Sequence, residues 1–260
     1  MSNKDRFILL SFDVEEFDMP LEYNYQISKQ EQLTVGKKGM DRIMPVLNHT
    51  NIQATLFTTA NFADHFPELI RGLSEQHEIA SHTYYHSHFE NEHLLSSKQK
   101  LETITGKPVY GLRMPRMRSV DMDEVKKAGY QYDSSINPTW LPGRYNNLHL
   151  PRTLYRDTGM LRLPASVSPN LRIPLFWLSF KNMPLQLFKF LALQTLKKDG
   201  YLCLYFHPWE FVDIHEYQLP LFTRRWCKDQ LLERLENIIQ YLQKEGEFIS
   251  TRSFINKKPR

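Results

Sequence analysis

The 260-residue sequence predicts an α/β fold in which about seven strands form a parallel sheet, either open or closed into a barrel. Short apolar runs rich in β-branched and aromatic residues alternate with segments of helical periodicity along the whole chain. Several of these runs end in acidic or histidine side chains, as strands do in α/β enzymes. With 41% hydrophobic residues and no recognisable repeat or linker, we expect one catalytic domain over residues 1–260.

The first half of the chain begins with a strand over residues 6–13, where the apolar run Phe7 to Leu10 leads into Asp13 and Glu15. A second strand is expected over 54–60, which is rich in β-branched and aromatic residues. The other expected elements are helices near 39–49 and over 62–75, 91–105 and 121–128, and strands over 77–82, ending at 111–115, and over 130–136.

The second half continues the alternation after an irregular interval that contains proline. We expect strands over 160–165, 201–207 and 247–251 and helices over 184–198 and 227–245. Residues 171–193 are unusually aromatic and are interrupted by two prolines. A run of Leu and Phe at helical spacing favours a connection and helix packed on the sheet. The alternative is that Phe176, Trp177 and Phe180 are exposed near the site and contact a membrane surface or a lipid-linked substrate.

Composition narrows the functional class. The formal charge of +4 and pI near 8.9 come from scattered Lys and Arg, which do not predict nucleic-acid binding. Two cysteines, Cys203 and Cys227, do not form a disulfide framework, so a reducing compartment fits. The first residues lack the apolar core of a signal peptide, and no apolar stretch approaches the roughly 18 residues of a membrane span. We therefore expect a cytoplasmic protein.

Polar side chains follow or end the predicted strands or, in the case of Asp133, lie within one, and parallel strands bring their carboxyl ends to one face. These side chains are Asp13, Glu15, His82, His86, Arg113, Asp133 and His207. His82 and His86, four residues apart, are expected on one side of a helical turn, where they could share a cation with a carboxylate. Two His and one carboxylate is the ligand count of a catalytic zinc site, although iron, cobalt, nickel or manganese could use it. The alternative is a His-rich surface, because five of ten histidines fall within 77–93.

At these positions the sequence resembles the polysaccharide deacetylases, also called the NodB-homology or carbohydrate esterase family four. Five segments carry the resemblance in the family's order and span nearly the whole chain. They are Phe12 to Glu15, His82 to His86, Arg113 to Pro115, Asp133 to Ser135, and Leu204 to Glu210. The His-Pro-Trp-Glu sequence at 207–210 and the segment 163–166 look closest to a subgroup associated with bacterial exopolysaccharide or capsule production. The resemblance implies a distorted (β/α) barrel.

The resemblance also implies roles for individual residues. Glu15, His82 and His86 would bind a divalent metal ion, for which zinc is the first expectation. Asp13 would be the general base and His207 the general acid. Arg113 would keep Asp13 ionised and oriented. Asp133 would orient His207 or, alternatively, make a structural hydrogen bond to a loop. Trp209 and Tyr84 would form walls of the site or pack in the core.

Two residues depart from the family pattern. Glu15 stands where aspartate is more usual, which adds a methylene group and bears on the position and affinity of the metal. Arg116 stands where an aromatic residue is frequent, and its positive charge favours a negatively charged or phosphate-linked glycan. The expected function is removal of acetyl groups from N-acetylhexosamine units of a bacterial glycan or lipid-linked precursor. A hydrolase of a small amide or cyclic ureide and a non-catalytic carbohydrate-binding domain are the alternatives; the intact Asp13, His82, His86 and His207 argue against the latter. Oligomeric state is left open.

Overall fold

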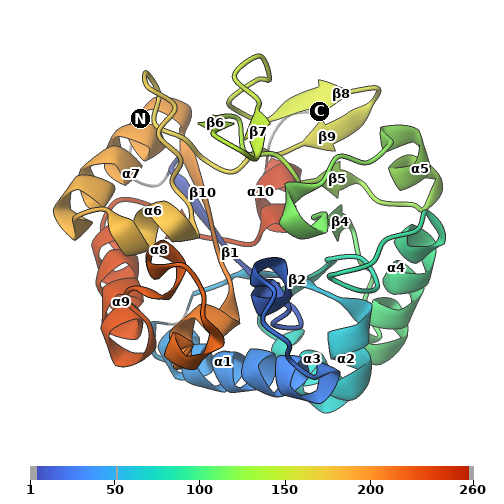
Figure 1. Cartoon of the computed structure of the whole chain (residues 1–260). Helices are drawn as coiled ribbons and strands as arrows, with labels where there is room; N and C mark the ends of the chain where they lie inside the picture. The colour runs from blue at the N-terminus through green and yellow to red at the C-terminus, as the bar shows by residue number, and fades with distance from the viewer. Residues whose placement is uncertain (1–4, 51, 258–260) are drawn as a thin grey trace.

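The structure, a computed structural model, describes residues 5–50 and 52–257 and consists of a curled sheet surrounded by helices (Figure 1). Within these residues, one sheet has the strand order β10-β1-β2-β3-β4-β5-β9-β8, and β11 also pairs with β1. Its strands are β1 (Phe7–Val14), β2 (Thr55–Thr58), β3 (Glu78–Ser81), β4 (Gly111–Leu112), β5 (Tyr132–Asp133), β8 (Tyr155–Asp157), β9 (Met160–Arg162), β10 (Tyr201–Phe206) and β11 (Glu247–Phe248). All pairings are parallel except that of β8 with β9, so the expected α/β class is confirmed.

Most helices lie around the outside of the curled sheet, whereas α10 lies at the centre of the view (Figure 1). The helices are α1 (Lys29–Thr50), α2 (Ala60–His65), α3 (Pro67–Leu73), α4 (Glu92–Thr105), α5 (Met122–Lys127), α6 (Trp177–Asn182), α7 (Leu185–Asp199), α8 (Leu221–Arg224), α9 (Lys228–Gln243) and α10 (Thr251–Lys257). Short 3₁₀ helices are η2 (Met19–Tyr23), η3 (Pro115–Met117), η4 (Pro208–Phe211) and η5 (His215–Tyr217). The strands β6 (Trp140–Leu141) and β7 (Tyr145–Asn146) form a separate antiparallel hairpin.

Several predicted boundaries were wrong for identifiable reasons. The helix expected over 62–75 is two helices, because Pro67 fixes its own φ and has no backbone N–H to continue α2. The helix expected near 39–49 begins at Lys29, where a largely polar first half hides the pattern. The β6–β7 hairpin, β8 and α10 were not predicted, since they are short and their periodicity is weak.

The strand β1 shows how the sheet positions the site. Alternate side chains of a strand lie on opposite faces. Leu10 and Phe12 belong to the main core under the helices, whereas Leu9 packs in the smaller cluster with Tyr201 and Phe254. Asp13 lies on the same face as Leu9, and it is buried at the carboxyl end of the strand. The interior face of the curled sheet therefore carries the polar end of β1.

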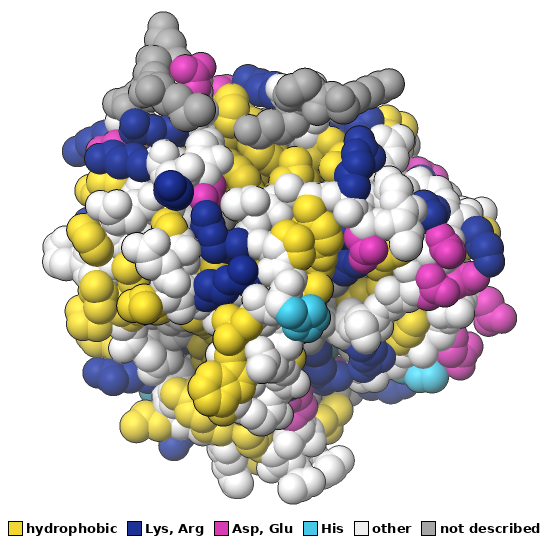
Figure 2. All heavy atoms as spheres, turned by 90° about the horizontal axis from the view of Figure 1, so that it is seen from above, with side chains coloured by type: hydrophobic (Ala, Val, Ile, Leu, Met, Phe, Trp, Pro, Cys, Tyr) yellow, Lys and Arg dark blue, Asp and Glu magenta, His cyan; other side chains and the backbone are white. Residues whose placement is uncertain are grey.

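Three aromatic residues of the segment 171–193 pack into the core, whereas Leu171 and Phe190 of the same segment are exposed. Phe176, Trp177 and Phe180 are 4%, 8% and 0% exposed, so the proposed exposed patch of these three residues is wrong. On the face shown in Figure 2, hydrophobic side chains are exposed in several separate places, with Lys and Arg side chains among them. None of the helices within 5–50 and 52–257 has the length and apolar composition to span a bilayer. Residues 1–4, on which the signal-peptide expectation partly rests, lie outside the described residues.

Candidate active site

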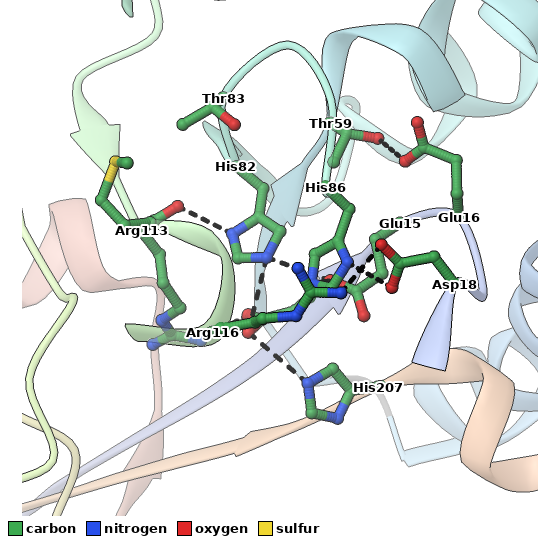
Figure 3. Close-up of polar contacts among 12 residues, drawn as sticks. Glu15, Glu16, Asp18, Thr59, His82, Thr83, His86, Arg113, Arg116 and His207 are labelled. Atoms are coloured by element: carbon green, nitrogen blue, oxygen red, sulfur yellow. Dashed lines mark hydrogen bonds and ion pairs between the residues drawn. The ribbon is translucent and has the colours of Figure 1, made fainter. Parts of the chain in front are cut away.

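Several of the predicted strand-end residues line a cavity of about 110 Å³ at the carboxyl end of the sheet. Asp13, Glu15, His86 and His207 line it, and Figure 3 shows Glu15, His82, His86 and His207 converging from different segments. Glu15 directly follows β1, His82 directly follows β3, and His207 directly follows β10. The convergence that was expected from parallel strand ends is therefore present.

Glu15, His82 and His86 form a compact set of possible metal ligands. The Nε2 atoms of His82 and His86 lie 3.0 and 3.1 Å from Glu15 Oε2. Ligand atoms of all three residues lie within 4.8 Å of one another, and all three side chains are buried. These residues combine two imidazoles with one carboxylate, which suits zinc and leaves coordination positions for other groups.

Hydrogen bonds to the other imidazole nitrogens orient both rings. His82 Nδ1 lies 2.7 Å from the backbone oxygen of Arg113, and His86 Nδ1 lies 2.7 Å from Asp18 Oδ1. Both oxygens accept hydrogen bonds, which assigns the hydrogen of a neutral ring to Nδ1 and leaves a lone pair on Nε2. Glu15 Oε2 then has no hydrogen-bond donor among the described residues. A divalent cation fits these three donor atoms, because it would satisfy all of them.

The charges around Glu15, His82 and His86 also favour a positive charge at this point of the site. Burial alone would raise the pKa of Glu15, but His86 and the contact with His82 hold it well below its usual range. Burial alone would lower the pKa of His86, but the neighbouring carboxylates of Glu15 and Asp18 raise it to about 9. Asp18 was not predicted from the sequence, although it lies close to the carboxylates of residues 13–16.

The segment 82–86 is a loop and not the expected helical turn. Thr83 has a φ of 62°, which is uncommon for a residue with a branched side chain. Its backbone oxygen accepts a hydrogen bond from the backbone N–H of Ala60, and the backbone N–H of Asn61 donates to Tyr84. These contacts hold the loop against α2, so the two imidazoles face Glu15 without helical geometry.

Asp13 is held by Arg113 at the centre of the site. Arg113 is 1% exposed, and its Nη1 donates to Asp13 Oδ1 at 2.6 Å. Ser134 accepts from the same guanidinium through its backbone oxygen and its hydroxyl, and the ring of Phe57 lies 4.0 Å from the guanidinium carbon. Asp13 Oδ2 remains directed toward the cavity, 4.0 Å from His82 Nε2 and 3.9 Å from His207 Nε2.

The carboxylate that orients His207 is Glu210, so the prediction that Asp133 does so is wrong. Glu210 Oε1 lies 3.1 Å from His207 Nδ1 and accepts from the backbone N–H of His207 at 2.7 Å. Asp133 instead accepts from Arg162 Nε at 2.8 Å and from Ser135. This matches the alternative of a structural bond to a loop. Burial alone would lower the pKa of His207, but Glu210 and the nearby carboxylates raise it.

Arg116 lies at the mouth of the cavity, but its charge is balanced by the protein. Its guanidinium donates to Glu22 and, at 3.0 Å, to Asp18 Oδ2. Arg144 of the β6–β7 hairpin donates to the second oxygen of Glu22 at 2.9 Å. Glu22 therefore connects two arginines across the mouth, and Arg116 no longer argues for a negatively charged glycan.

Trp209 is buried, lines the cavity and contacts a predicted metal ligand. Its Nε1 donates to Glu15 Oε1 at 3.0 Å, and its ring stacks on His207 with centroids 4.9 Å apart. Tyr84, the other expected wall, packs against Tyr85 and His93. The role of Trp209 toward Glu15 could not be predicted from sequence, because the two residues are 194 positions apart.

Trp209→Phe is expected to weaken zinc binding by about 10- to 100-fold, since loss of a hydrogen-bond partner of a metal ligand commonly has an effect of that size. The substitution keeps an aromatic ring but removes the donor to Glu15. Competition with a chromophoric chelator measures the affinity. Trp140→Phe is the control, because Trp140 is 60% exposed on the β6–β7 hairpin. Equal affinities in the two variants would contradict the assignment.

Two glycines allow α1 to pack directly on the site. A Cβ at Gly36 would lie 2.5 Å from the backbone oxygen of Glu15. A Cβ at Gly39 would lie 2.3 Å from the backbone C and O of Pro208 and 2.7 Å from the backbone nitrogen of Trp209. Backbone atoms cannot move aside as a flexible side chain can. Glycine at these positions therefore sets the distance between α1 and the segments that carry Glu15 and Trp209.

Gly39→Ala is expected to destabilise the protein and weaken metal binding, because the added methyl group pushes η4 away from α1. Gly72→Ala is the matched control: Gly72 lies in α3, and a Cβ there meets nothing within 4 Å. In a helix that change commonly stabilises by about 0.5–1 kcal/mol. Thermal unfolding and metal titration of both variants check the expectation. If Gly39→Ala has the same melting temperature and metal affinity as Gly72→Ala, the expectation is contradicted.

Comparisons with known proteins agree with this geometry. A family model described as polysaccharide deacetylase matches residues 2–132. No curated protein matches the chain. Among solved structures, the chain is similar to a probable polysaccharide deacetylase from Pseudomonas aeruginosa PAO1, with 17% identity, a TM-score of 0.69, and coverage of 98% of this chain and 91% of that one.

Two further solved structures are informative. Puue allantoinase has 15% identity, a TM-score of 0.67, and coverage of 98% of this chain and 90% of that one. A CE4 family pseudoenzyme from Bacillus anthracis has 13% identity, a TM-score of 0.50, and coverage of 96% of this chain and 64% of that one. At such identities these likenesses show the fold, which is the distorted barrel expected from the sequence.

Proposed function

The chain belongs to the polysaccharide deacetylase family, and from this premise we propose that it is a metal-dependent hydrolase of carbon–nitrogen amide bonds. Its proposed reaction is removal of acetyl groups from N-acetylhexosamine units of a bacterial glycan or a lipid-linked glycan precursor. One observation carries the proposal: the side chains of Glu15, His82 and His86 come together next to the cavity that Asp13 and His207 line.

Glu15, His82 and His86 are the residues that would hold the metal ion, with zinc as the first choice. When bound, a divalent ion there supplies Lewis-acid polarisation of an acetyl carbonyl and lowers the pKa of a water molecule. His82 and His86 present Nε2 because Arg113 and Asp18 engage their Nδ1 atoms. The protein's contribution at this point is orientation of the two rings and exclusion of bulk water by burial.

Asp13 is the proposed general base. Arg113 and the barrel interior fix Oδ1, so Oδ2 is the oxygen available to accept a proton from the attacking water. A positioned base of this kind commonly contributes about 10²–10⁴-fold to the rate. Arg113 holds the carboxylate but does not itself line the cavity, and it therefore acts as a positioning residue.

His207 is the proposed general acid. Its Nδ1 is directed at Glu210, so Nε2 is the nitrogen that donates a proton to the departing amine. Nε2 lies 3.9 Å from Asp13 Oδ2, which places base and acid on adjacent sides of the same space. Trp177 packs edge-on against His207, with ring centroids 5.1 Å apart, and lines the cavity beside it.

A second candidate function is hydrolysis of a small amide or cyclic ureide. The structural similarity to an allantoinase supports it. A non-catalytic carbohydrate-binding domain remains less favoured, because the base, acid and ligand side chains are all in place.

Metal analysis of the purified protein, combined with assays on N-acetylated glycans and small amides, tests the proposal. The expected result is about one divalent ion per chain and acetate release from an N-acetylhexosamine substrate. Lipid-linked and soluble glycans are compared in separate reactions, and this comparison tests whether the substrate is a lipid-linked precursor. Turnover of small amides or ureides without acetate release from any glycan would replace the first function by the second.

A further inference from the structure

Lys181 is a fully buried lysine close to the proposed general acid. It lies in α6, is 0% exposed, and its Nζ donates to the backbone oxygen of Thr223 at 2.7 Å. None of the proposed chemical steps uses it. A lysine is rarely enclosed so completely unless its charge is balanced by a partner.

The partner of Lys181 is the carboxylate that contacts His207. Lys181 Nζ lies 3.4 Å from Glu210 Oε2, and Glu210 is also 0% exposed. Within the described residues, Oε2 accepts no closer hydrogen bond. Oε1, by contrast, faces the ring and the backbone N–H of His207. Glu210 thus divides its two oxygens between a cation and the imidazole.

Two tryptophan rings enclose this arrangement. Trp177 and Trp209 each contact His207, and Lys181 Nζ lies 5.8 and 5.9 Å from the centroids of the same two rings. Both rings can attract the ammonium group through their faces. The aromatic surroundings exclude water, which strengthens the electrostatic interactions between the three charged or titratable groups.

Fold stability is a weak explanation for such a pair. The cost of removing both charges from water commonly cancels their attraction, and apolar residues of similar volume often stabilise a core as well or better. When His207 is neutral, however, the buried carboxylate beside it needs another cation nearby to remain charged. The arrangement is therefore better explained by what Glu210 does to His207.

We propose that Lys181 is a positioning residue for amide hydrolysis: it balances the charge of Glu210 so that this carboxylate holds the Nδ1 hydrogen of His207 and keeps Nε2 directed at the substrate. The inference rests on the proposed role of His207 as general acid. The contacts of Lys181 with Glu210 and of Glu210 with His207 connect α6 with the cavity. The proposed role of the segment 171–193 is therefore to supply Lys181 to the site.

Kinetics of Lys181→Met, Glu210→Gln and the double variant test the coupling. We expect each single variant to lower kcat by about 10- to 100-fold, a large share of what a positioned acid contributes, with KM within about twofold. Because Lys181 acts through Glu210, the double variant should be no slower than the slower single variant. Additive losses would overturn the proposal. Lys181→Gln, which can still donate to Thr223, serves if the methionine variant does not fold.

Phe188→Leu is the matched control, because Phe188 is buried in α7 and packs on Phe180, which is not one of the three residues Lys181, Glu210 and His207. It should lower the melting temperature but leave kcat close to that of the parent protein. If Phe188→Leu loses as much kcat as Lys181→Met, the effect of Lys181 is only structural and the proposal fails.

Nitrogen NMR of labelled histidine supplies a readout that needs no substrate. At a pH where His207 is neutral, the parent protein should show its hydrogen on Nδ1, and Lys181→Met should show a mixture of both tautomers. An unchanged tautomer in the variant contradicts the inference. If no N-acetylated substrate is hydrolysed, the deacetylase function fails, while the tautomer result still decides whether Lys181 positions His207.

Discussion

His86→Ala is expected to abolish both metal binding and hydrolysis. The substitution removes one of two imidazoles that lie within 3.1 Å of Glu15 Oε2, and it leaves only Arg116 as a side-chain partner of the buried carboxylate of Asp18. Removal of His82 should have the same outcome, whereas Glu15→Asp keeps the carboxylate and should retain part of the binding. Metal content by mass spectrometry and turnover on the same preparation provide the measurement.

His88→Ala is the matched control for this prediction. His88 lies two residues further along the same loop, but its side chain is 61% exposed and contacts Glu90. It should keep the metal and the parent rate. Full activity of the parent protein after thorough chelation, or a normal metal content in His86→Ala, would show that these residues are not the ligands.

Much of this site could be predicted from the sequence because its residues stand at the ends of apolar runs. Apolar runs that end in acidic or histidine side chains indicate buried parallel strands, and the carboxyl ends of such strands meet at one face. That reasoning placed Glu15, His82 and His207 together; in the structure Glu15 and His207 line one cavity, and His82 contacts Glu15. The order of the strands in the sheet did not need to be known.

The orienting residues could not be predicted in the same way, because they depend on side-chain packing between distant segments. Asp133 was assigned to His207, yet it pairs with Arg162 of the neighbouring strand β9. Glu210 lies only three residues after His207, but its role depends on the 3₁₀ turn at Pro208–Phe211. The role of Lys181 could not be predicted, because a single lysine in an aromatic run does not show which residue it contacts. Lys181 meets Glu210 only in the folded protein.

Asp13→Asn is expected to leave the metal bound and to lower kcat by about 10²–10⁴-fold, the usual contribution of a positioned general base. The amide has nearly the shape of the carboxylate but cannot accept the proton of the attacking water. Because Arg113 is buried and loses its counter-charge, we also expect a lower melting temperature. Activity is therefore measured well below that temperature.

Asp18→Asn is the comparison that separates a base from an orienting carboxylate. Asp18 contacts His86 Nδ1 at 2.7 Å and is as buried as Asp13, but it does not line the cavity. Its loss should weaken metal affinity, and saturating metal should restore most of the rate. Asp13→Asn should show the opposite pattern, with normal affinity and a rate that added metal does not restore. If Asp13→Asn loses its metal instead, Asp13 is a ligand and the base must be another group.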